Sequence, residues 1–238
     1  MNIAIIGYGR MGHEVEEMAI KRDHTVKLII DLENNSNLNE ENLKSIDVAI
    51  EFSSPDAAFK NITTCLVMKV PVVSGTTGWL KDFDKAVEIC KENRTSFLHS
   101  SNFSIGMNIL FKLNSELAKQ MCRYHEYSPV IEEIHHAKKL DAPSGTAITL
   151  AGEIIQQHSG FKSWCFEKDK TDNCIPINSI REGIVPGTHT VYWDSEIDKI
   201  SLKHEAKNRK GFALGAIIAA EFIHTRTGIF TMKDVLGF

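Results

Sequence analysis

Short apolar runs alternate with amphipathic segments along the first part of the chain. The apolar runs predict buried strands over residues 2–6, 25–30, 48–52, 70–74 and 96–99. Between them, apolar residues recur at helical spacing and predict helices over residues 11–22, 57–68 and 81–93. Residues 32–45 are polar and rich in Asn, so we expect a loop there. This alternation predicts an α/β unit with parallel strands joined by crossover helices.

The pattern changes after Phe103. Amphipathic or apolar stretches predict helices over residues 105–123, 142–157 and 212–224. Alternating and β-branched stretches predict strands over residues 130–135, 178–181, 188–193 and 197–204. Asp194 and Ser195 suggest a hairpin between the last two strands. We therefore expect a second, α+β unit whose open sheet is largely antiparallel, with helices on one face and a boundary near Phe103.

The composition is that of an ordinary globular protein. Hydrophobic residues make up 42% and charged residues 24% of 238 positions, which excludes a disordered chain, a coiled coil and a collagen-like repeat. The length fits one large domain or two modest ones. No apolar run reaches the roughly 18 residues of a membrane span, and the N-terminus lacks the pattern of a secretory signal. We therefore expect a cytoplasmic protein without a membrane partner.

The net charge bears on nucleic-acid binding, and the cysteines bear on the redox compartment. The formal net charge is −4, whereas proteins that grip bulk nucleic acid usually carry a basic surplus, so we expect no nucleic-acid partner. The cysteines are odd in number and scattered, at positions 65, 90, 122, 165 and 174. They form no C-x-x-C pair, so we expect free thiols in a reducing compartment rather than a zinc site or a disulfide scaffold.

A glycine-rich loop follows the first predicted strand and opens the first predicted helix. Its residues, Gly7-Tyr8-Gly9-Arg10-Met11-Gly12, match the dinucleotide-binding pattern G-x-G-x-x-G. Glycine permits the tight turn, the approach of the backbone to a pyrophosphate and close helix–strand packing, and the helix N-terminus attracts the phosphates. Asp31 ends the second strand, where an acid accepts both ribose hydroxyls of NAD. An ordinary glycine-rich turn is the competing interpretation, but the strand, the helix and Asp31 together favour a dinucleotide site.

The residues after Asp31 bear on the choice of cofactor. Leu32, Glu33 and Asn34 include no Arg that would pair with a 2′-phosphate, so the sequence favours NADH over NADPH. Arg10 lies in the glycine-rich loop and could reach such a phosphate. NADH, NADPH or both therefore remain possible cofactors.

Two further turns follow predicted strands. Gly75, Thr76 and Thr77 come after the fourth strand, and the stretch from Ser101 to Ser104 comes after the fifth. Because ligands of α/β sheets bind at the carboxyl ends of the strands, these turns are candidates for contacts with the nicotinamide and its ribose. Plain connecting loops are the alternative.

The most unusual stretch runs from residue 132 to residue 146. His135 and His136 titrate near neutral pH, Lys139 adds a positive charge, and Ser144 is a candidate helix N-cap. The amides of Gly145 and Thr146 would then face an anion. The combination suits the binding of a carboxylate and the delivery of a proton.

Interpretations of the same stretch without a catalytic role remain open. Adjacent histidines on a strand point apart, which disfavours a shared metal ion, and we expect none. The lysines could simply be solvated, and His136 could be a structural histidine.

These motifs together resemble the dihydrodipicolinate reductase family. The resemblance rests on the glycine-rich loop, on Gly75-Thr76-Thr77-Gly78, on Asn102-Phe103-Ser104-Ile105-Gly106 and on His135-His136 … Lys139-Leu140-Asp141-Ala142-Pro143-Ser144-Gly145-Thr146-Ala147. The tail is also similar, at Arg181-Glu182-Gly183, His189-Thr190, His204, Thr227-Gly228 and Met232 to Leu236. The match runs end to end, and the block from His135 to Thr146 is its most specific part.

The resemblance implies an architecture and an activity. It implies a Rossmann-type α/β dinucleotide-binding domain over residues 1–104 and 210–238. It also implies an α+β substrate and tetramerisation domain with an open mixed sheet over residues 105–209. Such an enzyme reduces a small cyclic dicarboxylate with NADH or NADPH in lysine and diaminopimelate biosynthesis, as a cytoplasmic homotetramer.

The resemblance also implies roles for individual residues. The proton donor falls on His135 and the second catalytic group on Lys139, while substrate carboxylate contacts fall on His136, Gly145 and Thr146. Cofactor contacts fall on Gly7, Tyr8, Gly9, Arg10, Met11, Gly12, Asp31, Gly75, Thr76, Thr77, Ser100, Ser101, Asn102 and Phe103.

The chain departs from the family pattern at two places. Ala137 and Lys138 replace an Arg-x pair that often precedes the catalytic lysine, and the Arg common after the acidic residue at position 31 is absent. Another nicotinamide-dependent dehydrogenase, such as one acting on aspartate, is the alternative enzyme, and the substrate that oxidises NADH would discriminate it. An NAD-sensing regulator is the alternative of a different class, but no basic helix-turn-helix is visible.

Overall fold

The computed structural model describes residues 1–238 and divides them into two compact units. The first unit comprises Met1–Ile105 together with Arg209–Phe238, and the second comprises Gly106–Asn208. The chain thus leaves the first unit once and returns to it near the C-terminus. Each unit has its own sheet and its own core.

The sheet of the first unit is wholly parallel. Its strand order is β11-β5-β4-β3-β1-β2, and each neighbouring pair runs parallel. The strands are β1 (Asn2–Ile6), β2 (Thr25–Ile30), β3 (Val48–Glu51), β4 (Val72–Ser74), β5 (Ser96–His99) and β11 (Gly228–Phe230). The five strands expected from the apolar runs are confirmed. The short edge strand β11 was not predicted.

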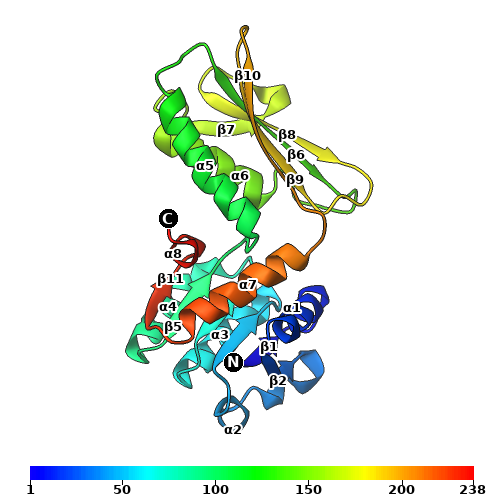
Figure 1. The fold of residues 1–238 in the computed structure, drawn as a ribbon, viewed down its shortest axis with the longest axis vertical. Coiled ribbons are helices and arrows are strands. Elements are labelled where there is room, and N and C mark those ends of the chain that lie inside the picture. The colour runs from blue at the N-terminus through cyan, green and yellow to red at the C-terminus, as the bar shows by residue number, and fades with distance from the viewer. The chain divides into compact units, whose positions relative to one another are not determined.

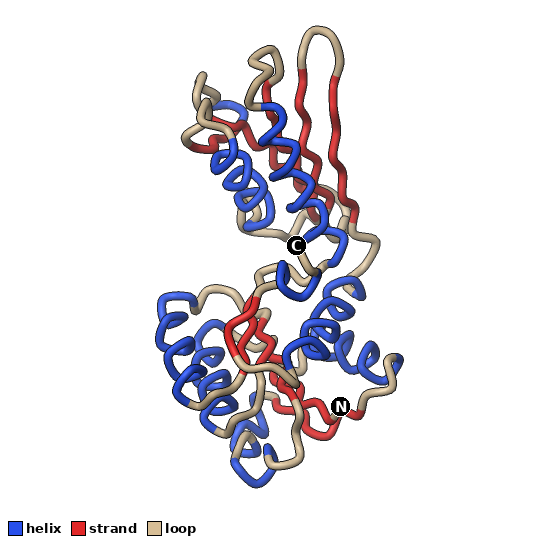
Figure 2. Tube along the Cα trace, turned by 60° about the vertical axis from the view of Figure 1, so that its left-hand side comes forward, coloured by secondary structure: helices blue, strands red, loops and turns tan.

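Helices cover both faces of this sheet, as the ribbon and tube views show (Figures 1 and 2). Ile3 and Ile5 of β1 point into a cluster with α1 (Arg10–Lys21) and α7 (Lys210–Ile223). Ala4 and Ile6 point into the opposite cluster, with α3 (Pro55–Val67) and α4 (Phe83–Glu92). Because successive side chains of a strand face opposite sides, the continuous apolar run of β1 serves two cores. A last short helix, α8 (Met232–Leu236), also packs on the α7 side.

The expectation of a loop over residues 32–45 is wrong. The segment contains a 3₁₀ turn over Leu32–Asn37 and the short helix α2 (Glu40–Leu43). Asp31 accepts a hydrogen bond from the Leu32 backbone, and Asn39 accepts one from the Asn42 backbone. Polar Asp and Asn side chains thus cap short helical turns, which an apolar periodicity cannot reveal.

The sheet of the second unit is mixed, as the family resemblance implied. Its order is β10-β9-β6-β8-β7; β9 is antiparallel to β10 and β6, whereas β8 is parallel to β6 and β7. The strands are β6 (Ser128–His135), β7 (Ser163–Phe166), β8 (Cys174–Arg181), β9 (Thr188–Asp194) and β10 (Lys199–Glu205). A largely antiparallel sheet was therefore an overstatement, because the unpredicted β7 and the crossover to β8 add two parallel pairings. The hairpin between β9 and β10 is confirmed.

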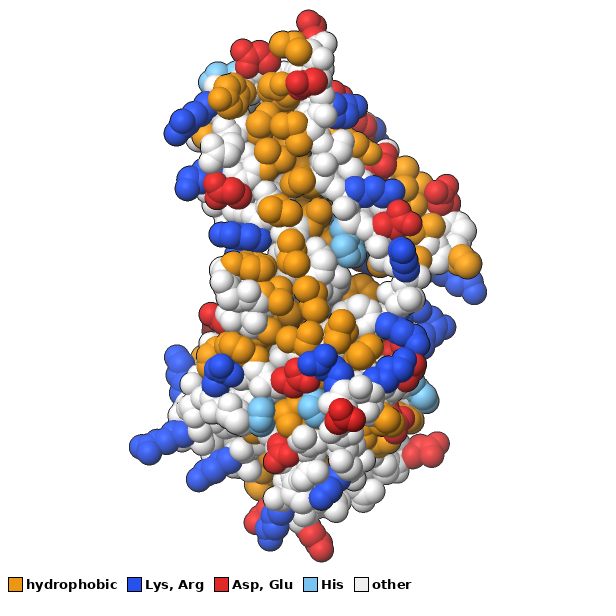
Figure 3. All heavy atoms as spheres, in the orientation of Figure 1, with side chains coloured by type: hydrophobic (Ala, Val, Ile, Leu, Met, Phe, Trp, Pro, Cys, Tyr) orange, Lys and Arg blue, Asp and Glu red, His pale blue; other side chains and the backbone are white.

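Two helices pack on one face of this mixed sheet. They are α5 (Ile105–Met121) and α6 (Gly145–Gln157), and their apolar side chains join Ile131, Ile177 and Val191 in one core. Helix α6 begins at Gly145 rather than at residue 142, since Ser144 caps it. On its other side α5 exposes Ile109 and Leu113 at 44% and 51%, and apolar side chains gather over this face of the unit (Figure 3).

The expectation of five free thiols is wrong for one pair. Cys165 on β7 and Cys174 on β8 form a disulfide, while Cys65, Cys90 and Cys122 are free. The two strands are parallel neighbours in the sheet, which brings the two cysteines together although they are separated by a connecting segment. Burial raises the pKa of the Cys65 thiol to about 12. None of the helices is both long and apolar enough to cross a membrane.

Candidate active site

The glycine-rich loop has the backbone that its sequence pattern requires. Gly7 has a φ of +91°, and a Cβ there would lie 2.2 Å from the Phe52 carbonyl oxygen. A Cβ on Gly12 would lie 2.5 Å from the Gly7 carbonyl oxygen, whereas nothing lies within 4 Å of a Cβ on Gly9. Any side chain at positions 7 or 12 would therefore distort the loop. The space beside Gly9 stays open at the point where α1 presents its first amides.

Two cavities adjoin this loop at the carboxyl ends of the first unit's strands. The first, of about 260 Å³, is lined by Gly7, Tyr8, Gly9 and Asp31 together with residues that follow β3. The second, of about 440 Å³, is lined by Gly9, Arg10, Met11, Gly75, Thr76 and Thr77 among others. Gly9, Phe52 and Ser53 line both. The structure thus brings together the predicted cofactor residues that follow β1, β2 and β4.

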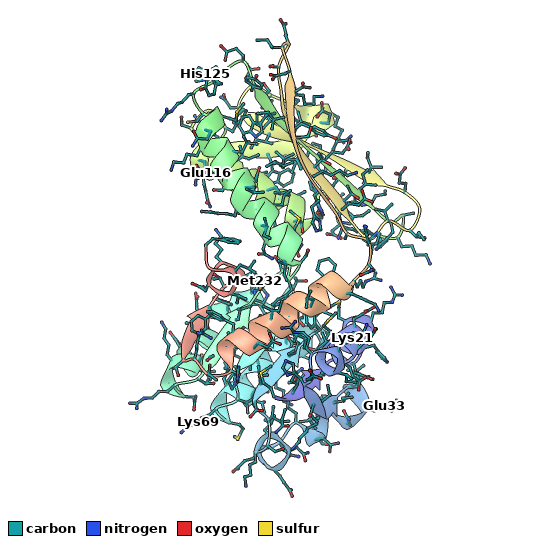
Figure 4. All side chains as sticks on the ribbon, viewed as in Figure 1. Lys21, Glu33, Lys69, Glu116, His125 and Met232 are labelled. Atoms are coloured by element: carbon teal, nitrogen blue, oxygen red, sulfur yellow. A yellow bond between two sulfur atoms is a disulfide. The ribbon has the colours of Figure 1, made fainter.

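Asp31 lies at the end of β2, where the sequence pattern places the acid that meets a ribose. Its side chain is exposed and accepts a hydrogen bond from the Leu32 backbone. The exposed Glu33 follows it on the 3₁₀ turn (Figure 4). Leu32 and Asn35 of the same turn line the first cavity. No arginine lines this cavity.

The loop after β5 is organised by its own polar groups. The Ser100 hydroxyl donates to the Asn102 carbonyl oxygen, and the Asn102 side chain accepts from the Ser104 backbone. Phe103 is buried and packs with Phe52, at 5.8 Å between ring centroids. Ser100 to Phe103 line neither of the two cavities beside Gly9, but Phe103 contacts Phe52, which lines both of them.

A buried carboxylate that the motifs did not reveal underlies these loops. Glu51, at the end of β3, is fully buried. It accepts hydrogen bonds from the backbone and hydroxyl of Ser53 and from the hydroxyls of Ser74 and Thr76. One side chain therefore ties the turns after β3 and β4 together. The only sequence signal was a glutamate ending an otherwise apolar strand.

The residues present fit a bound dinucleotide. The absence of a Cβ atom at Gly9 leaves space for a diphosphate to approach the backbone, while Gly7 and Gly12 allow the close backbone packing that shapes the loop. The amides of α1 and the carboxylate of Asp31 are the complementary polar groups. A ligand of this kind would extend from the Asp31 side of the loop toward Thr76.

The second unit places its chemical groups on one face of β6. Glu133 and His135 are buried, whereas Glu132, Ile134 and His136 are less so, as strand alternation requires. The structure therefore separates the two adjacent histidines, as the sequence argument against a shared metal assumed. The His136 backbone continues past the strand and donates to the Val185 carbonyl oxygen.

Glu133 is the centre of a hydrogen-bonded cluster. The Arg181 guanidinium donates to its Oε1 at 2.7 Å, and the Ser144 backbone donates to the carboxylate at 3.0 Å and 3.1 Å. Burial alone would raise the pKa of Glu133, but the hydrogen bonds from Ser144 and Arg181 outweigh it and hold the pKa below its ordinary value. The carboxyl group is thus kept ionised in the interior of the unit.

Two imidazoles face this carboxylate. His135 Nδ1 lies 3.5 Å and His189 Nε2 lies 3.8 Å from Glu133 Oε2. Burial lowers the pKa of His135, an effect that the charge of Glu133 opposes. Burial, followed by the charge of His135, lowers the pKa of His189 to about 3, so His189 is neutral at physiological pH.

Lys139 and the start of α6 complete the cluster. Lys139 Nζ donates to both oxygens of the Asp141 carboxylate, at 2.8 Å and 2.9 Å. The Ser144 hydroxyl accepts from the Ala147 backbone and so caps α6, as predicted, and Gly145 and Thr146 form its first turn. The structure therefore collects His135, Lys139, Gly145 and Thr146 around one helix N-terminus.

The cluster is already balanced in charge. Glu133, His135 and His189 have ligand-type atoms within 4.8 Å of one another. Arg181, however, already supplies the cation that pairs with Glu133, and a metal ion beside a guanidinium would be repelled. We therefore assign no metal ion to these residues.

Motif reasoning missed three members of this cluster. Glu133 was hidden beside Glu132 in the same strand, while Arg181 on β8 and His189 on β9 appeared only as isolated matches in the tail. A buried, paired acid two residues before His135 could have been suspected from strand alternation. The positions of Arg181 and His189 beside Glu133 could not have been predicted, because they depend on the register of β8 and β9 in the folded sheet.

The fold and the two sets of residues define an oxidoreductase of the dinucleotide-binding class. Two family models match, dihydrodipicolinate reductase N-terminus over residues 1–103 and dihydrodipicolinate reductase C-terminus over residues 106–236. A 4-hydroxy-tetrahydrodipicolinate reductase of Christiangramia forsetii is 56% identical over 100% of this chain and 98% of its own length. The chain belongs to the dihydrodipicolinate reductase family, and the two alternative classes are set aside.

Other relatives agree with this membership. A 4-hydroxy-tetrahydrodipicolinate reductase of Thermosipho africanus is 34% identical over 99% of this chain and 98% of its own length. The solved dihydrodipicolinate reductase of a Paenisporosarcina species superimposes with a TM-score of 0.79 at 23% identity, with 97% of each chain covered, which supports the fold.

Proposed function

We propose that this protein reduces 4-hydroxy-tetrahydrodipicolinate to tetrahydrodipicolinate, with NADH or NADPH, in lysine and diaminopimelate biosynthesis. The observation that carries the proposal is the convergence of His135, Lys139 and the N-terminus of α6 in the second unit. A proton donor, a cation and the positive end of a helix suit a ring that carries two carboxylates. Two reductases of this name match the chain over nearly its whole length, and the Paenisporosarcina enzyme was solved with dipicolinate bound.

The residues of the second unit bind the substrate and move the proton. Lys139 exchanges the Asp141 carboxylate for a substrate carboxylate, and the amides of Gly145 and Thr146, with His136, hold the other charged oxygens. Positions fixed in this way raise the effective concentration of the reacting groups. Loss of the 4-hydroxyl group as water leaves an unsaturated ring, which takes up the hydride at one ring carbon. His135, as imidazolium, donates a proton to the neighbouring ring carbon. A bound dianion favours the charged imidazole and so offsets the effect of burial.

The first unit supplies the cofactor site. When bound, the dihydronicotinamide supplies the hydride. The diphosphate binds to the loop from Gly7 to Gly12 and to the start of α1. Tyr8 lines the first cavity beside this loop, and Arg10 and Met11 line the second. Asp31 accepts the ribose hydroxyls. The contacts beyond the ribose come from Gly75, Thr76, Thr77 and residues 100–103. The absence of an arginine among the residues that line the first cavity favours NADH.

The remaining features follow the family resemblance. We propose that residues 1–104 and 210–238 form the dinucleotide-binding domain and that residues 105–209 bind substrate and form the contacts of a homotetramer. Association would cover the apolar side chains Ile109 and Leu113 that α5 exposes. A cytoplasmic location follows from the use of a soluble nicotinamide cofactor.

Steady-state kinetics with substrate generated in situ test the proposal. His135→Gln should lower kcat by about 10²- to 10⁴-fold because the general acid is lost. Lys139→Ala should mainly raise KM for the dicarboxylate, and NADH and NADPH should be titrated separately. Lys138→Ala is the matched control, since Lys138 is an exposed neighbour outside the cluster. A wild-type kcat in His135→Gln together with an unchanged KM for the dicarboxylate in Lys139→Ala would refute the assigned roles.

A further inference from the structure

We infer that Glu133 is a positioning residue for the reaction: its carboxylate holds His135 by Nδ1, so that Nε2 is the atom that delivers the proton. The inference rests on the proposed role of His135 as proton donor. In this inference Glu133 acts on the reaction through His135 and does not contact the substrate.

The geometry of the imidazole carries the inference. Nδ1 of His135 is buried and has no hydrogen-bond partner, and the nearest acidic atom, Glu133 Oε2, lies 3.5 Å away. Catalytic hydrogen bonds are often long before substrate binds and shorten in the complex. The ring is therefore aimed at the carboxylate and needs only a small movement to donate to it. The proton on one ring nitrogen is decided by the partner of the other, so this contact directs the transferable proton to Nε2.

Gly187 lies on the Nε2 side of the same ring. It has a φ of +157°, and a Cβ there would lie 3.1 Å from His135 Nε2. The segment between β8 and β9 thus approaches the ring closely without a side chain. The imidazole lies between a carboxylate on one side and a bare backbone on the other.

Glu133 is itself held rigidly. Arg181 from β8 and the Ser144 backbone at the start of α6 donate to it, and its side chain is fully buried. Ser144 is also the N-cap of the helix whose first amides are proposed to bind substrate. One carboxylate therefore couples the orientation of the proton donor to the position of the anion-binding helix end.

The other charged groups around His135 act with or against Glu133. The charges that affect the titration of His135 are those of Glu133 on β6, of Lys139 and Asp141 in the segment that follows, and of Arg181 on β8. The ring of His189 on β9 packs against that of His135, at 5.0 Å between ring centroids. Lys139 and Arg181 disfavour the imidazolium, and Asp141 and Glu133 favour it. His189 stays neutral. Removal of the Glu133 charge would take away a group that favours the imidazolium and would leave the positive charge of Arg181 beside the ring without its partner. Both effects would lower the pKa of His135.

Nuclear magnetic resonance of the free protein, without cofactor or substrate, is the direct test. The His135 ring would be followed with ¹⁵N-labelled histidine and assigned by its absence from the His135→Gln spectrum. In the wild type at high pH we expect the Nδ1–H tautomer, in contrast to the Nε2–H form that free histidine prefers. In Glu133→Gln we expect the pKa of His135 to fall by about 1 to 2 pH units.

The chain offers a matched control and a conservative variant. Glu132 lies next to Glu133 on the opposite face of β6, near the Tyr192 hydroxyl, so Glu132→Gln should leave the His135 titration unchanged. Glu133→Asp keeps the negative charge and should bring the pKa of His135 part of the way back to its wild-type value. In kinetics, the alkaline limb of kcat/KM, where the His135 imidazolium loses its proton, should move to lower pH in Glu133→Gln and not in Glu132→Gln.

The outcomes separate this inference from the proposed function. A wild-type Nε2–H tautomer would overturn the inference, and so would an unchanged His135 pKa in folded Glu133→Gln. The tautomer is measured in the wild type and needs no Glu133 variant, so it decides the matter even if Glu133→Gln fails to fold. If the tautomer and pKa behave as expected but the dicarboxylate is not reduced, the proposed function fails and the Glu133–His135 contact stands.

Discussion

Two buried glutamates, one in each unit, show how a single residue organises a site. Glu133 faces the His135 ring and accepts hydrogen bonds from the backbone at the start of α6, and Glu51 connects the turns after β3 and β4. Both carboxylates are fully buried. Glu133 has a cationic partner, whereas the hydrogen-bond donors to Glu51 are neutral hydroxyls and one backbone amide. Buried charges of this kind are costly unless every oxygen is hydrogen-bonded, so they are sensitive points for substitution.

At the residue scale, Glu51→Gln should weaken cofactor binding more than it slows the chemical step. The amide nitrogen of glutamine would face hydroxyl donors that now point at a carboxylate, and the turn carrying Thr76 would loosen. We expect KM for NADH to rise while kcat changes little, and a loss of about 1–3 kcal/mol in unfolding free energy. Fluorescence titration of NADH and thermal unfolding measure the two effects.

An exposed acidic residue of the first unit provides the comparison for Glu51. Glu88 is exposed on α4, so Glu88→Gln should leave NADH affinity and unfolding unchanged. Equal NADH affinity in Glu51→Gln and the wild type would show that the buried carboxylate has no part in forming the cofactor site.

At the element scale, the packing of α7 on the first unit depends on one glycine. A Cβ on Gly215 would lie 1.7 Å from the Phe103 carbonyl oxygen, whereas nothing lies within 4 Å of a Cβ on Gly211. Gly215→Ala should therefore displace the helix or the loop after β5 and cost about 1–3 kcal/mol. Gly211→Ala, on the exposed side of the same helix, should stabilise by about 0.4–1 kcal/mol. Chemical denaturation of both variants measures the difference.

Opposite signs are the essential expectation for these two glycines. A destabilised Gly211→Ala, or a Gly215→Ala as stable as the wild type, would contradict the close approach of α7 to Phe103. Because Phe103 lies in a proposed cofactor loop, Gly215→Ala should also weaken NADH binding.

The central strands that the sequence predicted share a physical property. The central strands β1, β3, β4 and β5 are buried on both faces, so their residues are almost continuously apolar. The two strands that were missed, β7 and β11, are short and half-buried at sheet edges. The edge strands β2 and β10 were predicted because they have six and seven residues, whereas β7 and β11 have four and three, which is too short for a pattern to repeat.

At the scale of the whole molecule, the two units should differ in their dependence on the C-terminal segment. The core of the second unit contains only residues between 107 and 193, with Leu202 packed against it. The core of the first unit includes Ala213, Ala216, Ile217, Ala220 and Ile223 of α7. A fragment of residues 105–208 should therefore unfold cooperatively, whereas a chain of residues 1–208 should lose the folded first unit.

Circular dichroism during heating and NADH titration measure the two truncations. The chain of residues 1–208 should fail to bind NADH, because the sheet loses β11 and one face loses α7. If that chain bound NADH as tightly as the full protein, the C-terminal segment would not be an integral part of the first unit.

The sequence by itself determined whatever depends on neighbours along the chain. The glycine-rich loop, the strands with continuous apolar runs, and the group of His135, Lys139, Ser144, Gly145 and Thr146 all lie within short segments, where spacing alone orients side chains. Tertiary structure alone decided the rest. Arg181 and His189 reach Glu133 because β8 and β9 flank β6 in register, and Cys165 meets Cys174 because β7 and β8 are neighbours. Such contacts depend on strand order and register, which are set by the packing of the whole sheet rather than by any local pattern.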